Sequence, residues 1–300
     1  MKKMFVSSLY YVFRDIDFAL GGGYRQNICY ANEGYIHISI DDVSLCLRNL
    51  LTYQYASIWD EPLFGFLYLL HNEYHAKFSL YIFLNDRWDL IKEQHKKELN
   101  TASNWLKFGL HSRDFSFSYT NTKYDDTKKD WNSFVKKVLS FTDNTNSIDR
   151  FPRLHNYSGS RESLCGMRDA NYGPIGFLTA DSDRSSYYLE HEIGDCEFYS
   201  DKDSDLCFKK TNMRGDWFTP RFSSEYNYKS PEHYSIYQEL VLRNYKNIEW
   251  FCHEWQLYKK DKLNYKKMWL LDVCYYAAQY GIPFEFPETI YLQIKSKNKL

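Results

Sequence analysis

The chain has 300 residues, of which 38 are Lys or Arg and 39 are Asp or Glu, so the formal net charge at pH 7 is -1. This balance provides no basic field for a polyanion, which argues against nucleic acid as a partner. The seven cysteines contain no Cys-x-x-Cys pair, so we expect reduced thiols in a cytoplasmic protein. No segment reaches membrane-spanning length, and the short apolar run after Lys2 and Lys3 has no cleavage site of a signal peptide.

Short apolar runs alternate with longer segments of helical periodicity, which is typical of a parallel sheet covered by helices. The predicted strands are residues 35–40, 78–84, 106–110, 151–154, 175–180, 248–252 and 284–286. The predicted helices are residues 61–75, 86–99, 128–141, 163–169, 231–245 and 266–281. The simplest architecture for about seven such units is a single α/β barrel of the (β/α)7 type.

One stretch interrupts this alternation. Residues 183–229 are rich in Asp, Ser and aromatic side chains, and we interpret them as an insertion or hairpin excursion. Residues 1–34 precede the first predicted strand and are expected to pack on the barrel as an N-terminal extension. The prediction is therefore one barrel domain over residues 1–300.

Polar side chains follow most of the predicted strands, at the end where barrel enzymes carry their active sites. They are Asp41-Asp42, Asn85-Asp86, His111-Ser112, His155-Asn156, Asp181 and His253-Glu254. Carboxylates and imidazoles that converge at one place suit a divalent metal with an open position for water. The sequence thus favours a metal-dependent enzyme.

Each of these residues also has a structural explanation. An Asp pair after a strand commonly forms a turn or caps the next helix, and a lone His is often a satisfied core or loop residue. The 28 Tyr, 21 Phe and 8 Trp suit a sugar-binding cleft, but packing is the simpler explanation for them. The argument for a site comes from several such residues at equivalent barrel positions.

Three short motifs resemble those of the polysaccharide deacetylases, the NodB-like proteins of carbohydrate esterase family 4. They are ISIDDVS at 38–44, GLHS at 109–112 and WFCHE at 250–254, and RFPRLH at 150–155 is similar to the arginine-proline motif of that family. The motifs stand in the family's order over about residues 35–255. The resemblance implies a metal-dependent hydrolase that removes acetyl groups from an N-acetylated or O-acetylated saccharide.

The resemblance also implies roles for particular residues. Asp41 would be the general base, Asp42 and His111 would bind a divalent metal, expected to be zinc, and His253 would protonate the leaving group. Either Arg150 or Arg153 would orient Asp41; the family motif points to Arg150 as part of the catalytic set.

The chain departs from the family pattern in two places. Phe115 stands where the family has its second histidine ligand, and Val43 replaces the usual glycine after the Asp pair. Phenylalanine cannot bind a metal, so another residue must complete the site if it is intact. His155 is the best placed by sequence, with Asp114 as a lesser candidate.

Further residues are candidates for contacting the saccharide, with Tyr157 and Trp255 as stacking platforms. The full set is Arg153, Tyr157, Asp181, Glu254 and Trp255. Two alternatives stay open. A glycoside hydrolase would pair Asp41 with Asp181 or Glu254 as its two carboxylates. A non-catalytic glycan-binding protein would have lost metal ligation, as Phe115 suggests.

Overall fold

The computed structural model describes residues 34–180, 186–189, 198–211, 213–214, 247–258 and 265–297. They belong to a compact unit formed by Asn32–Leu300, and a second unit, Met1–Ala31, lies outside the described residues. The predicted packing of residues 1–34 and the predicted helix at 231–245 also lie outside them, so both stay predictions.

The main sheet has five strands, and every neighbouring pair is parallel. Its order is β3-β2-β1-β8-β7, with β1 at Tyr35–Val43, β2 at Phe78–Phe83, β3 at Leu106–Ser112, β7 at Met213–Arg214 and β8 at Asn247–His253. All six residues of β2 are buried, because parallel strands are covered on both faces. The near-continuous apolar runs of the sequence reflect this double coverage.

A second sheet has the order β4-β6-β5 and consists of β4 (Gly176–Leu178), β5 (Phe198–Asp201) and β6 (Leu206–Lys209). Residues 148–154 link it to β3. Along this segment, Asp149 N donates to Phe108 O at 2.7 Å, and Pro152 O accepts from Leu178 N at 2.9 Å. The predicted α/β barrel is confirmed, with its strands in two sheets instead of one closed ring of ladders among the described residues.

The structure corrects one prediction about these strands and adds detail to another. The segment predicted as a strand at 151–154 forms no regular ladder, because Pro152 lacks the N–H group that a central strand donates. The segment predicted as an insertion or hairpin excursion contains the antiparallel pair β5–β6, and it also joins both sheets, since β6 pairs with β4 and β7 pairs with β8. Polar residues around these short strands hid their pairing.

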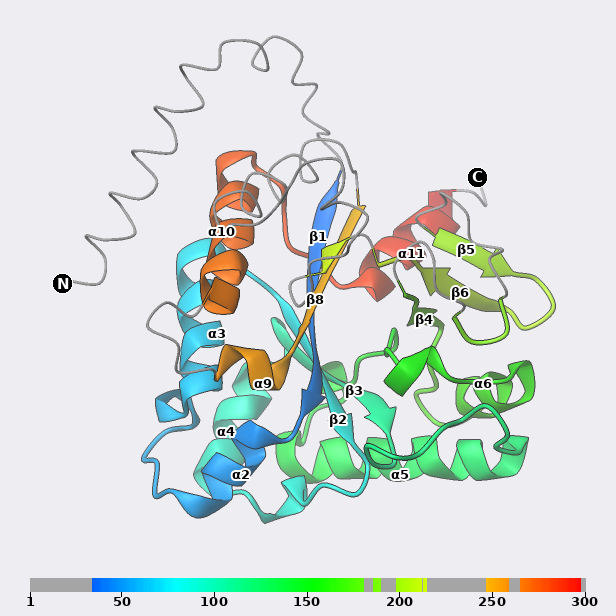
Figure 1. Cartoon of the computed structure of the whole chain (residues 1–300), viewed down its shortest axis with the longest axis horizontal. Coiled ribbons are helices and arrows are strands. Elements are labelled where there is room, and N and C mark those ends of the chain that lie inside the picture. Colours follow the sequence, from blue (N-terminus) through cyan, green and yellow to red (C-terminus); the bar gives the residue numbers. More distant parts are fainter. Residues whose placement is uncertain are drawn as a thin grey trace, which may run out of the picture. The chain divides into compact units, whose positions relative to one another are not determined.

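Helices cover the strands (Figure 1). They are α2 (Leu45–Thr52), α3 (Pro62–Tyr74), α4 (Glu93–Thr101), α5 (Tyr124–Thr142), α6 (Arg161–Arg168), α9 (Glu254–Leu257), α10 (Tyr265–Gln279) and α11 (Pro287–Lys297), with 3-10 turns η2 (Ile58–Asp60), η3 (Trp88–Leu90), η4 (Thr145–Ser147) and η5 (His155–Tyr157). Helix α10 packs on α3, and α6 packs on α5. Within the described ranges, no helix combines the length and the apolar composition needed to cross a bilayer.

The turn after β1 is held in place from β8. Glu254 is fully buried, and its carboxylate accepts hydrogen bonds from the backbone N–H groups of Ser44, Leu45 and Cys46 at 2.6 to 2.7 Å. These amides begin helix α2, whose own N-cap side chain makes no capping bond. A carboxylate at a helix N-terminus satisfies free amides and is favoured by the helix dipole. The end of β8 therefore fixes the chain just after Asp42.

We expect Glu254→Ala to lower the free energy of unfolding by about 3 kcal/mol, because three backbone amides at the start of α2 lose a charged acceptor. Urea unfolding followed by circular dichroism measures the change. Glu93→Ala is the control, since the Glu93 side chain is 74% exposed in the first turn of α4. An equal midpoint for Glu254→Ala and the wild type would contradict the capping role.

Candidate metal centre

The acidic pair lies at the end of β1, where the strand loses its regular register. A bulge separates Ile40 from Val43, and Asp42 has a left-handed backbone with φ of 57°. Asp tolerates this conformation better than most residues. A bulge next to a site re-aims side chains that would otherwise alternate between faces. It lets the consecutive Asp41 and Asp42 side chains contact Arg153 and His111 at the same strand end.

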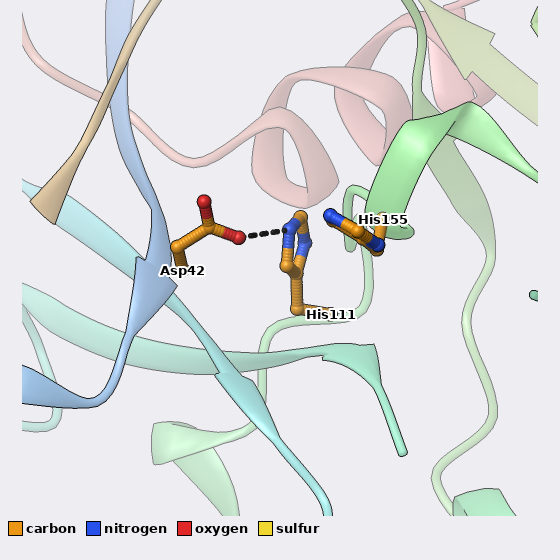
Figure 2. A group of neighbouring side chains, drawn as sticks. All are labelled: Asp42, His111 and His155. Atoms are coloured by element: carbon orange, nitrogen blue, oxygen red, sulfur yellow. Dashed lines mark ion pairs between the residues drawn. The ribbon is translucent and has the colours of Figure 1, made fainter. Parts of the chain in front are cut away.

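His111, at the end of β3, has a fixed tautomer in its neutral form. Its Nδ1 lies 2.6 Å from the carbonyl oxygen of Arg153, which can only accept, so Nδ1 carries a hydrogen. Nε2 then presents its lone pair 3.2 Å from Asp42 Oδ1 (Figure 2). Two lone pairs at this distance need a proton or a cation between them. A metal-binding His typically donates its second N–H to such a carbonyl.

His155, in η5, brings the third ligand atom to the same place (Figure 2). One ligand atom from each of Asp42, His111 and His155 lies within 4.8 Å of the others. Ligand atoms around a tetrahedral zinc, each about 2 Å from the ion, are roughly 3.3 Å apart. Side-chain shifts of about 1 Å would close the three atoms on one ion. Asp42 Oδ1 is buried and accepts no aligned hydrogen bond within the described residues, which also fits a metal ligand.

The protonation states suit metal binding. Burial acts to raise the pKa of Asp42, but its contact with His111 and the nearby His253 and His155 outweigh burial, so the pKa is lowered. Burial, followed by the neighbouring His111, lowers the pKa of His155. Near neutral pH, Asp42 is therefore a carboxylate and His155 a neutral imidazole, the forms that coordinate a cation.

Asp41 is held by Arg153. The Nη1 atom of Arg153 lies 2.9 Å from Asp41 Oδ1 and 2.7 Å from Ser39 Oγ. Of the two arginines predicted for this task, the structure places Arg153 against Asp41. The Arg150 side chain instead contacts Glu288 Oε1 at 3.2 Å and the carbonyl of Gly173, and Arg153 takes the predicted place beside Asp41. Arg153 is only 1% exposed, so it is not available to contact substrate as predicted.

The remaining predicted residues differ in their placement. His253 Nε2 lies 3.8 Å from Asp42 Oδ2, with a quarter of the side chain exposed. Trp255 is 44% exposed next to the site. Glu254 does not fit the predicted contact with substrate, because it is fully buried against α2. Tyr157 is half-buried in η5, and Asp181 lies outside the described residues.

Asp114, the lesser candidate for the metal, lies elsewhere. Its carboxylate accepts hydrogen bonds from Ser116 N and Oγ at 2.9 and 2.7 Å. It does not belong to the cluster of metal-ligating atoms found in the described part of the chain.

A pocket of about 480 Å³ opens beside the cluster. Its lining residues are Asp42, Ser44, Leu45, Phe83, Asn85, Asp86, Asp114, Phe115 and Trp255. Sequence reasoning did not assign Phe83 or Phe115 to a binding surface. Phe83 lies inside the predicted strand 78–84 and Phe115 lies five residues beyond the predicted strand 106–110, so the strand-end rule points to neither.

Comparison with solved structures identifies the fold of this chain. Neither a protein-family model nor a curated protein matches the sequence. Among solved structures, a putative polysaccharide deacetylase from Mycobacterium smegmatis is similar with a TM-score of 0.54 and 11% identity, over 89% of this chain and 92% of that chain. The chain has the fold of a polysaccharide deacetylase. The fold class and the resemblance inferred from the motifs are thereby confirmed at the level of the fold.

A second solved structure is similar over much of the chain. It is a family 4 acetyl xylan esterase from Clostridium thermocellum in complex with a cobalt ion, with a TM-score of 0.41 and 10% identity, over 84% of this chain and 87% of that chain.

Asp86, in the pocket wall, provides a test of the local electrostatics. Burial raises its pKa from 3.8 to about 6, partly offset by Lys137 and Arg48. A raised acid pKa destabilises the folded state at pH values above it, so stability falls as pH rises from about 4 to about 6. After discounting for partial exposure, the penalty at neutral pH is about 1 kcal/mol.

We therefore expect Asp86→Asn to raise the melting temperature at pH 7.5 by about 2 °C and to leave it unchanged at pH 4. Differential scanning calorimetry at both pH values measures this. Asp89→Asn is the control, because the pKa of Asp89 is lowered by Arg87 and its neutralisation gives no such gain. A melting temperature of Asp86→Asn below that of the wild type at pH 7.5 would contradict the predicted gain in stability.

Proposed function

We propose that this protein is a metal-dependent hydrolase that removes acetyl groups from an N-acetylated or O-acetylated saccharide. The observation that carries the proposal is the convergence of Asp42, His111 and His155 within 4.8 Å, next to an Asp41 held by a buried arginine. These groups lie at the strand ends where barrel enzymes perform chemistry. The deacetylase fold agrees with this use of the site.

The ligand set favours zinc. Two imidazoles and one carboxylate are a common catalytic zinc set, and they leave a position open for water. Such a metal supplies Lewis acidity to water and to the acyl carbonyl. His111 is already oriented for this task by its bond to the Arg153 carbonyl.

The chain's own residues move the protons. Asp41 accepts the proton of the attacking water, and Arg153 keeps its carboxylate oriented through the 2.9 Å contact. His253, a quarter exposed and 3.8 Å from Asp42, is placed to give a proton to the departing amine or alcohol. This donation matters most for an amine, which is a poor leaving group as an anion.

Two observations count against the alternatives. A glycosidase that paired Asp41 with Glu254 would need Glu254 free, but its carboxylate is buried in three hydrogen bonds to α2. A binding protein without a metal was suggested by Phe115, but His155 offers the missing imidazole from another element. A metal-dependent deacetylase agrees both with the buried Glu254 and with His155 beside Asp42 and His111.

Metal binding is tested with Phe115 itself. We expect the purified protein to bind one zinc ion, and His155→Ala to weaken zinc binding about 100-fold, because one of three ligands is lost. Phe115→His added to His155→Ala should recover binding, since the Phe115 ring lies 4.9 Å from the His155 ring. Zinc titration against a chelating dye measures the affinity. Wild-type affinity in His155→Ala would contradict the ligand assignment.

Activity is tested by acetate release from N-acetylated and O-acetylated saccharides, with and without added zinc. We expect Asp41→Asn to lower kcat by a factor of about 10² to 10⁴ while zinc binding persists, because the base is lost and the ligands stay. Asp203→Asn is the matched control, as the Asp203 side chain is 74% exposed on the β5–β6 turn. Acetate release that is unchanged by a metal chelator and by Asp41→Asn would refute the mechanism.

A further inference from the structure

Two exposed aromatic rings line the pocket beside the metal cluster. Phe115, in the loop after β3, is 69% exposed, and Trp255, in α9, is 44% exposed. Phe115 is the most exposed large hydrophobic side chain in the described residues. An exposed ring of this size at the mouth of a pocket indicates a ligand contact more than a packing role.

The loop that carries Phe115 is ordered by its own hydrogen bonds. Asp114 accepts from Ser116 N and Oγ, and Asn85 Nδ2 donates to Asp114 at 3.3 Å. The Phe115 ring also lies 4.9 Å from the ring of His155. The ring is therefore presented to the pocket by a defined turn.

The charges that the described residues bring to the pocket are of one sign. Among these lining residues the charged side chains are Asp42, Asp86 and Asp114, and none is a Lys or Arg. Asp42 belongs to the metal cluster, which leaves two carboxylates for a ligand. Aromatic faces stack on the apolar face of a sugar ring, and carboxylates accept hydrogen bonds from hydroxyl and ammonium groups. An anionic sugar would meet repulsion here.

Building on the proposed function, we infer that this pocket binds the sugar unit next to the one that loses its acetyl group. Phe115 and Trp255 contact its ring, and Asp86 and Asp114 favour a cationic amino sugar over a uronic acid. Removal of an N-acetyl group leaves an amine that is partly protonated near neutral pH and so carries positive charge. The pocket therefore prefers units that the reaction itself has produced, which favours deacetylation of neighbouring units in succession.

Binding to the full chain is measured by isothermal titration calorimetry, with tetramers of glucosamine, N-acetylglucosamine and galacturonic acid as probes. We expect the glucosamine tetramer to bind at least about tenfold more tightly than the galacturonate tetramer, with a ratio that shrinks as salt is added. Phe115→Ala should weaken glucosamine-tetramer binding about tenfold, and Phe115→Tyr should retain it.

Charge is tested by Asp114→Asn, which should reduce the preference for the glucosamine tetramer over the N-acetylglucosamine tetramer, whereas Asp203→Asn should not. Phe115 is exposed and Asp114 is partly exposed, so these variants are expected to melt like the wild type. Unchanged binding in Phe115→Ala, or galacturonate binding as tight as glucosamine binding, would overturn the inference.

The same variants are assayed for acetate release, which separates the two proposals. A wild type that binds the glucosamine tetramer through Phe115 but releases no acetate refutes the hydrolase and supports the sugar contact. A wild type that releases acetate, with binding indifferent to Phe115→Ala, refutes only the subsite.

Discussion

The site depends on one buried guanidinium. Burying an arginine is unfavourable unless its charge and its donors are satisfied. Arg153 meets this demand at both terminal nitrogens, which bridge Asp41 at 2.9 Å and Glu249 at 3.0 Å and also bond to the hydroxyls of Ser39 and Thr211. Its Nε has no aligned acceptor among the described residues. The bridge joins the irregular segment 148–154 to β1 and β8, two strands that pair directly. The backbone of the same residue accepts the Nδ1 hydrogen of His111, so Arg153 orients both the proposed base and a proposed ligand.

The network extends further into the barrel through His37. Its Nδ1 lies 2.5 Å from Glu249 Oε2, and its Nε2 lies 2.8 Å from Ser79 Oγ on β2. Neither His37 nor Glu249 was among the site residues predicted from the sequence. A signal was present, because His37, Ser39 and Asp41 recur with a period of two on β1 and so share one face of the strand. Polar residues at that period in a buried strand indicate a common interior network.

The sequence predicted the central strands and their polar ends because both follow from local patterns. Apolar runs identify β1, β2, β3 and β8, and the residue after each run falls at the rim of the barrel. It could not decide between Arg150 and Arg153, because an irregular segment has no periodicity that fixes which side chain faces inward. It misassigned Glu254 for a related reason: a residue just after a strand can face the pocket or cap a distant helix, and only tertiary packing distinguishes the two.

The segment His253–Trp255 has a mechanical consequence for the whole rim. The His253 side chain lies near Asp42, and the Glu254 carboxylate accepts hydrogen bonds from the amides that follow the acidic pair. The Trp255 side chain forms part of the pocket wall. Displacing the indole would therefore strain the turn that carries the carboxylates, so the proposed sugar contact and the proposed chemistry depend on one rigid unit. Under the proposed function, divergence in glycan preference should arise more readily at Phe115, whose loop makes no such bond to that turn within the described residues, than at Trp255.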